Sequence, residues 1–116
     1  MINLKKLHHN AYRCNNSENT RKFYEDFLGL PLVDAFEIST TMTGRATKVL
    51  HTFYSLNDGS SLAFFEVANK TLKYKKWHDF DLHIALQVDE NILLKYYKLG
   101  KDNGIETRGI SDHGFI

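Results

Sequence analysis

The chain contains a single cysteine, Cys14, and this scarcity excludes an internal disulfide bond. A domain without disulfides suits a reducing compartment, so we expect a cytoplasmic protein. Long hydrophobic runs are absent too: no apolar stretch reaches the roughly 20 residues that a membrane-spanning helix needs. The sequence therefore predicts no membrane partner.

Excess charge of either sign is also missing. The net charge is +1, so overall electrostatics predicts no nucleic-acid partner and no attraction to a membrane surface. The basic run between Lys70 and Lys76 is short, and we interpret it as a solvated loop. With 42% hydrophobic and 25% charged residues, the composition is that of a globular protein. Its 116 residues suffice for one compact domain, residues 1–116.

What the sequence does contain is an ordered series of strand and helix patterns. Residues 7–14 predict a strand, and the next polar residues predict a helix that is capped by Ser17 and ends at Gly29. Three further strands are predicted, the last two joined by a tight turn at Asn57-Asp58-Gly59. They span residues 32–38, 47–55 and 61–67. The first part of the chain thus predicts a βαβββ order with its last strands antiparallel.

The second part repeats this order incompletely. A strand is predicted at residues 82–88, then a helix capped near Asp89 that ends at Gly100 or Gly104, then a strand at 105–110. We therefore expect module one at 1–68, a linker at 69–80 and a truncated module two at 81–116. Missing strands would leave an open sheet edge, which favours a homodimer in which a second chain fills the gap.

Four segments of the sequence carry a family resemblance. They are HNAYR at residues 9–13, TRKFYEDFLGL at 20–30, DGSSLAFFE at 58–66 and HIALQV at 83–88, with FYEDFLGL the most specific. Together they resemble the vicinal oxygen chelate superfamily, which includes glyoxalase I, bleomycin- and fosfomycin-resistance proteins and extradiol dioxygenases. The resemblance implies an α+β fold of paired βαβββ modules that form one cupped mixed sheet. It also implies a metal in the cup and a small-molecule substrate that binds the metal through two vicinal oxygens.

The same resemblance implies the metal ligands. Ligands at the start of each module's first strand correspond to His9 and His83. The ligand position on the fourth strand of module one is occupied by Ala63, which cannot bind a metal, and Glu66 points to the opposite face of that strand. This pattern resembles extradiol dioxygenases, in which a glutamate on the last strand completes the set, and that strand would lie beyond Ile116. Two histidines and one carboxylate suit Fe(II), so we expect Fe(II) or Mn(II) as the cofactor.

Further candidates lie outside this ligand set. His51 is a candidate acid or base if its side chain reaches the cup; otherwise it is a core histidine satisfied by a hydrogen bond. His113 lies in a loop where related dioxygenases often carry a site histidine. Arg13 shares a strand face with His9, so it either binds an anionic substrate group or is a surface residue. Strand alternation places His8 on the face opposite His9.

Three functions follow from these residues. The first is a metal-dependent extradiol dioxygenase that cleaves a catechol-type ring. The second is a metal-dependent lyase, isomerase or thiol transferase of the glyoxalase or resistance type, which needs no oxygen. The third is a metal-free binding protein that sequesters a ligand between two subunits. Because one fold hosts many activities, the resemblance leaves all three open.

Overall fold

The computed structural model describes residues 2–71, 73 and 83–112. The chain divides into two compact units, Met1–Lys75 and Lys76–Ile116. The boundaries predicted for the modules and the linker stay predictions, because residues 74–82 lie outside the described ranges. No helix within those ranges is long and apolar enough to cross a membrane.

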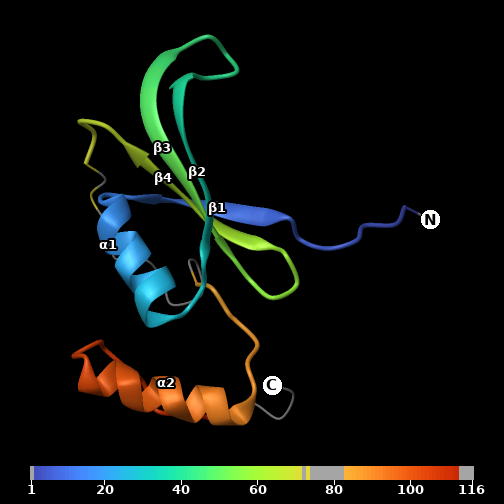
Figure 1. The fold of residues 1–116 in the computed structure, drawn as a ribbon, viewed down its shortest axis with the longest axis vertical. Coiled ribbons are helices and arrows are strands. Elements are labelled where there is room, and N and C mark those ends of the chain that lie inside the picture. Colours follow the sequence, from blue (N-terminus) through green and yellow to red (C-terminus); the bar gives the residue numbers. More distant parts are fainter. Residues whose placement is uncertain (1, 72, 74–82, 113–116) are drawn as a thin grey trace. The chain divides into compact units, whose positions relative to one another are not determined.

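The first unit has the predicted βαβββ order (Figure 1). Its sheet has the strand order β1-β4-β3-β2, with β1 parallel to β4 and the other pairs antiparallel. This mixed sheet and the helices beside it confirm the α+β fold class. The elements are β1 (His9–Cys14), α1 (Ser17–Arg21), the π-helix η1 (Lys22–Phe27), β2 (Leu32–Thr40), β3 (Ala46–Ser55) and β4 (Ser61–Val67).

One face of the sheet holds the hydrophobic core beneath α1 and η1. Tyr54 is fully buried, and its ring lies 5.8 Å from that of Tyr24, a residue of η1. The ring of Phe64 lies 4.8 Å from the ring of Tyr24. Leu62 and the thiol of Cys14 complete this buried cluster. Burying these apolar surfaces fixes which face of the sheet the helices cover.

The helix begins with a cap that differs from the prediction by one residue. Asn16, rather than Ser17, is the N-cap: its Oδ1 accepts a hydrogen bond of 2.9 Å from the Asn19 amide. Asparagine and serine are both favoured at this position, so the sequence alone could not choose between them. The backbone amide of Ser17 instead donates to the Glu66 carboxylate, which ties the helix to β4.

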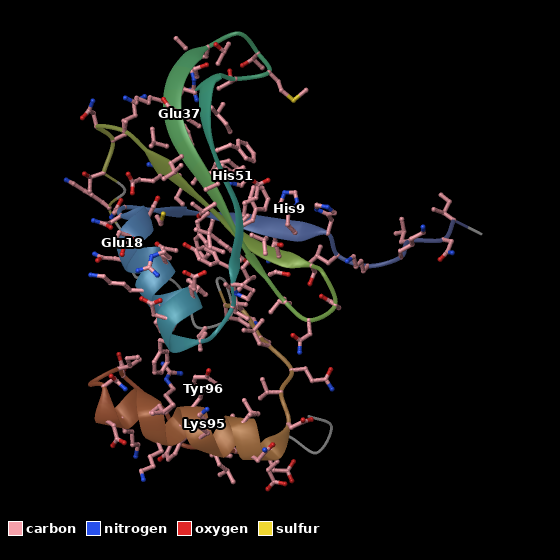
Figure 2. All side chains as sticks on the ribbon, in the orientation of Figure 1. His9, Glu18, Glu37, His51, Lys95 and Tyr96 are labelled. Carbon is pink, nitrogen blue, oxygen red and sulfur yellow. The ribbon has the colours of Figure 1, made fainter. Side chains whose placement is uncertain are left out.

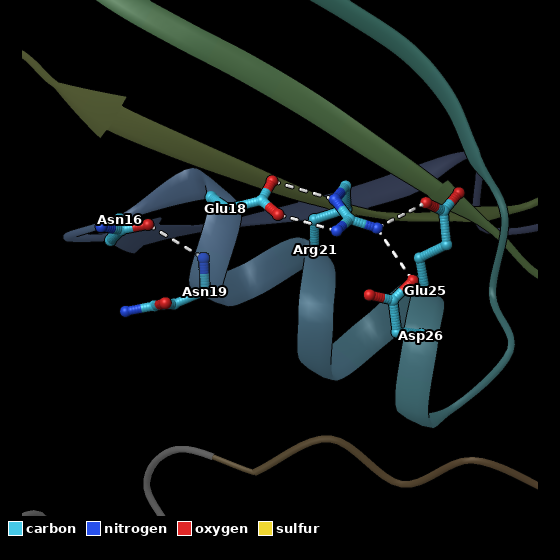
Figure 3. A network of polar contacts seen from close by, with 6 residues as sticks. All are labelled: Asn16, Glu18, Asn19, Arg21, Glu25 and Asp26. Atoms are coloured by element: carbon cyan, nitrogen blue, oxygen red, sulfur yellow. Dashed lines mark hydrogen bonds and ion pairs between the residues drawn. The ribbon is translucent and has the colours of Figure 1, made fainter.

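Arg21 joins three carboxylates of α1 and η1 (Figure 3). Its guanidinium lies 2.7 Å from Glu18, 3.1 Å from Glu25 and 2.8 Å from Asp26. The second oxygen of Glu25 accepts a 2.7 Å hydrogen bond from the Leu32 amide, at the first residue of β2. This network therefore connects α1, η1 and the start of the next strand.

The second unit contains one described helix, α2 (Glu90–Asp102), preceded by Asp89 as its N-cap. The helix passes through Gly100, where an added Cβ would lie 2.9 Å from Thr107 Oγ1. It closes at Gly104, whose φ of +70° is accessible to glycine at low cost. Of the two predicted ends, the later one is therefore the better match.

The strands predicted in the second unit are wrong for the residues that the structure describes. Residues 83–88 and 105–110 adopt no regular secondary structure there, and Leu82 lies outside the described part. A β-strand is stabilised by hydrogen bonds to a neighbouring strand, and the described residues of this unit offer none. The β-forming side chains alone did not suffice.

Candidate functional site

The face of the sheet opposite the helix-covered core carries the candidate site. Register and strand alternation place one set of side chains on it, from all four strands. We call this surface the cup face. Its residues include His9, Ala11, Arg13, Asp34, Phe36, Ile38, Val49, His51, Phe53, Ala63, Phe65 and Val67.

Two small side chains lie side by side on the cup face. Ala63 is fully buried and lies between Ala11 of β1 and Phe53 of β3. The centroid of the His9 ring lies 5.3 Å from that of Phe53 and 6.3 Å from that of His51. Figure 2 shows the labelled His9 and His51 near one another. Small residues here bring a first-strand histidine close to a third-strand histidine.

His8 does not lie on the face opposite His9, so that prediction is wrong. The Nδ1 atoms of the two imidazoles lie 2.8 Å apart. Strand alternation fails because β1 begins only at His9, so His8 precedes the pleated segment. One nitrogen of the pair must donate. When His9 donates through Nδ1, its Nε2 keeps a lone pair, as in histidines that bind metals.

The side chain of His51 belongs to the cup face and is also a core histidine satisfied by a hydrogen bond; its role as acid or base stays a prediction. It is 6% exposed, and its Nδ1 lies 3.0 Å from the carbonyl oxygen of Phe64. A carbonyl can only accept, so Nδ1 carries the proton and Nε2 of the neutral ring has a lone pair. Its ring also packs among aromatic side chains of the cup face, 3.8 Å from Phe65 and 4.2 Å from Phe53. His51 is thus a buried, hydrogen-bonded histidine whose orientation leaves a basic nitrogen.

Arg13 is exposed on the cup face, directly opposite Phe65 of β4 in the strand register. Its Nη2 donates a 3.1 Å hydrogen bond to the carbonyl oxygen of Lys70, beyond the end of β4. The side chain lines a cavity of about 510 Å³ at this end of the cup face. Its position is compatible with the predicted role in binding an anionic group.

The donor atoms for a metal fit in part. In the first unit, His9 offers an imidazole nitrogen of the type that Fe(II) and Mn(II) accept. Glu66 points to the helix-covered face, as predicted, where its carboxylate accepts a hydrogen bond from the Ser17 amide. It is therefore no substitute for a ligand on the cup face. Across the described residues, no group of three or more histidine, cysteine or carboxylate side chains is placed to hold a metal ion.

The remaining predicted site residues belong to the second unit. His83 is exposed and precedes α2, outside any helix or strand. His113 lies outside the described residues, so its role stays a prediction. The cup face is defined by the four strands of the first unit, so neither residue is one of its members.

Sequence reasoning missed two features of this face. One is the pairing of His8 with His9, which the position of the strand start would have indicated. The other is the aromatic wall formed around His51 by Phe36, Phe53 and Phe65. This wall could have been predicted from the sequence. Once the register of the four strands is known, alternation places these three phenylalanines on the same face as His9 and His51.

Comparison with known proteins identifies structures with a similar fold. Two solved structures of the genomically encoded fosfomycin resistance protein FosX from Listeria monocytogenes match the chain at 17% identity. One is a mutant complexed with Mn(II) and 1S,2S-dihydroxypropylphosphonic acid; it has a TM-score of 0.63 and covers 96% of this chain and 79% of that chain. The other is the monoclinic form at pH 5.75, with a TM-score of 0.60 over 89% and 73%.

A search of curated proteins found no match. At 17% identity, the FosX structures support the fold alone. The sequence pattern of a protein family, in contrast, matches nearly the whole chain, residues 6–115. The chain therefore belongs to the Glyoxalase/Bleomycin resistance protein/Dioxygenase superfamily, the vicinal oxygen chelate group.

Proposed function

We propose that this protein is a metal-dependent enzyme that acts on a small molecule with vicinal oxygens at the cup face. The observation that carries the proposal is the pair His9 and His51. Their rings lie 6.3 Å apart, and each engages its Nδ1 atom in a short contact, with His8 and with the Phe64 carbonyl. Nε2 of His51 is therefore left for a metal or a substrate, and so is Nε2 of His9 when His9 donates to His8 through Nδ1.

In this proposal, His9 and His83 are the metal ligands, as the family resemblance implies. A bound Fe(II) or Mn(II) ion would supply Lewis acidity toward the two substrate oxygens. His51 would accept a proton from a substrate hydroxyl at Nε2, since its Nδ1 proton is committed to the Phe64 carbonyl. Arg13 would bind an anionic substituent of the substrate. His113 is retained as a second candidate acid or base.

The leading chemistry is extradiol cleavage of a catechol-type ring. The aromatic wall supports it, because Phe36, Phe53 and Phe65 offer ring faces and edges to a planar substrate. Such a reaction consumes one O₂ per diol and places both oxygen atoms in the ring-opened product. Because Ala63 has no donor atom, the fourth strand of the first module supplies no carboxylate ligand at this position, in line with this assignment.

A second candidate is a reaction of the glyoxalase or resistance type. It is favoured by the FosX structure that holds Mn(II) and a phosphonate diol, since that protein has the same fold. This chemistry needs no oxygen. Ligand sequestration without a metal is the third alternative.

Anaerobic reconstitution distinguishes these alternatives. Metal-free protein is loaded with Fe(II) or Mn(II), mixed with catechol, and then exposed to O₂ while oxygen uptake and ring-opened product are recorded. Stoichiometric oxygen uptake that is absent in His9→Ala supports the dioxygenase. Turnover of an epoxide or a hemithioacetal without oxygen supports the second candidate, and a protein that takes up no metal contradicts both.

We also propose that the protein is a cytoplasmic homodimer. Buried Cys14 needs no disulfide partner, which suits a reducing compartment. The ring of Phe36 is 42% exposed on the cup face, where a partner chain would cover it. Light scattering of the purified protein tests the dimer, and a monomer at every accessible concentration would refute it.

A further inference from the structure

The cavity at the end of the cup face differs from the His9–His51 region in its charge. It has a volume of about 510 Å³. Residues of the first unit line it, from β1, the β2–β3 hairpin and β4, together with Lys70. Three cationic side chains line it and no carboxylate does. They are Arg13, Arg45 and Lys70.

No carboxylate of the described residues neutralises these cations. Within the described ranges, none of the three forms an ion pair, whereas Arg21 on the helix contacts three carboxylates. The only hydrogen bond that their charged groups make in those ranges runs from Arg13 to a backbone carbonyl. Glu37 and Glu66 alternate with cavity residues along β2 and β4, so strand geometry directs them to the other face. Unpaired guanidinium groups around a concavity favour an anionic ligand.

The hairpin turn holds Arg45 in place. The Thr41 amide donates to the Arg45 carbonyl at 2.9 Å, and the Arg45 amide donates to Thr41 Oγ1 at 3.1 Å. Gly44, with a φ of +86°, permits this tight turn. The backbone that carries the arginine is therefore tied on both sides rather than being a free loop.

The rest of the lining is apolar or hydroxylic. Ile38, Val49 and Val67 line the cavity from three adjacent strands, and threonines at its rim add hydroxyl groups. Phe65 lines it as well, and its other side stacks against His51. An apolar wall beside a cationic rim suits a molecule with a compact hydrophobic body and one oxyanion group.

We propose that this cavity binds a small organic oxyanion, a phosphonate, phosphate ester or carboxylate with an apolar body, held by Arg13, Arg45 and Lys70. The planar guanidinium groups match the paired oxygens of such groups, and three positive charges favour a dianion over a monoanion. That the bound molecule is the substrate rests on the proposed function. Binding of the anion itself requires no metal.

The test uses the metal-free full chain and the probes phenylphosphonate and benzoate, followed by isothermal titration and by backbone amide NMR shifts. We expect phenylphosphonate to bind more tightly than benzoate and both to weaken as salt is raised. Arg45→Gln should weaken phenylphosphonate binding at least about tenfold, since a charge-assisted hydrogen bond is lost. The matched control is Lys48→Gln, which removes a positive charge from the same hairpin on the opposite face, and it should leave binding within about twofold.

Each outcome of the test is decisive for the cavity. No saturable binding at millimolar probe, or equal weakening by Arg45→Gln and Lys48→Gln, overturns the inference. If metal uptake fails while phenylphosphonate still binds through Arg45, the proposed metal-dependent function is lost but the anion site stands. If the metal binds and phenylphosphonate does not, the anion site is lost and the proposed metal-dependent function stands.

Discussion

The imidazole of His51 lies face to face with the ring of Phe65, with centroids 3.8 Å apart and planes inclined by 21°. His51 lies near His9 on the cup face, and Phe65 also lines the cationic cavity. This one stacked pair therefore joins the proposed proton acceptor to the proposed anion site. A substrate held by its anionic group in the cavity would extend its reactive part past Phe65 toward His51.

Replacing His51 separates its structural role from its proposed chemical role. His51→Phe keeps an aromatic ring against Phe65 but leaves the Phe64 carbonyl without its side-chain donor, so we expect a loss of about 1 kcal/mol in the free energy of unfolding. His51→Asn keeps a donor near that carbonyl and loses the stacking. Both variants should fold, as urea denaturation will show, and both should lose turnover because neither side chain has a basic nitrogen. Full turnover in either variant would eliminate His51 as the base.

The N-cap offers a test of the helix that covers the core. Asn16→Ala removes the acceptor of the Asn19 amide hydrogen, and we expect a loss of about 1 kcal/mol in the free energy of unfolding. Asn19→Ala is the matched control: the same substitution three residues later, where alanine favours the helix and the change should be neutral or slightly stabilising. Denaturant midpoints measure both. Equal effects of the two substitutions would mean that Asn16 is not the cap.

Acid should weaken the network around Arg21. The hydrogen bond from this guanidinium lowers the pKa of Glu18 below its ordinary value of 4.5. A carboxyl group with a lowered folded-state pKa stabilises the fold above its unfolded-state pKa, and this contribution is lost as pH falls through the lowered value. We therefore expect the urea midpoint of the wild-type protein to fall below about pH 4.5 more steeply than that of Glu18→Gln. Parallel pH profiles for the two proteins would show that the pair contributes nothing measurable.

The sequence predicted the first module well because its signals are local and mutually consistent. Alternating apolar residues, the turn at Gly59 and the stop at Gly29 each specify one element, and the register then follows from burial of one face. Residues 61–67 formed a strand with the predicted bounds. Even Ala63 was correctly placed on the face opposite Glu66.

The second unit shows where local signals are insufficient. Residues 83–88 have the alternation of a strand, but strand formation depends on a partner whose presence a single segment does not encode. Similar reasoning applies to the site. His8 was misplaced because alternation was extended one residue before β1. Arg45 was overlooked because it lies between two predicted strands, and its hydrogen bond to Thr41 is visible only in the structure.

The central claim, a metal held through His9, is tested most directly by titrating Mn(II) into the metal-free protein and following free Mn(II) by electron paramagnetic resonance. The account predicts saturable binding by the wild-type chain, loss of at least about 100-fold in affinity for His9→Ala and for His83→Ala, and a loss of about tenfold for His8→Ala, since partners of metal ligands contribute less. Lys48→Gln should bind as the wild type does. A wild-type protein that takes up no Mn(II), or a His9→Ala variant that binds it with unchanged affinity, would contradict the account.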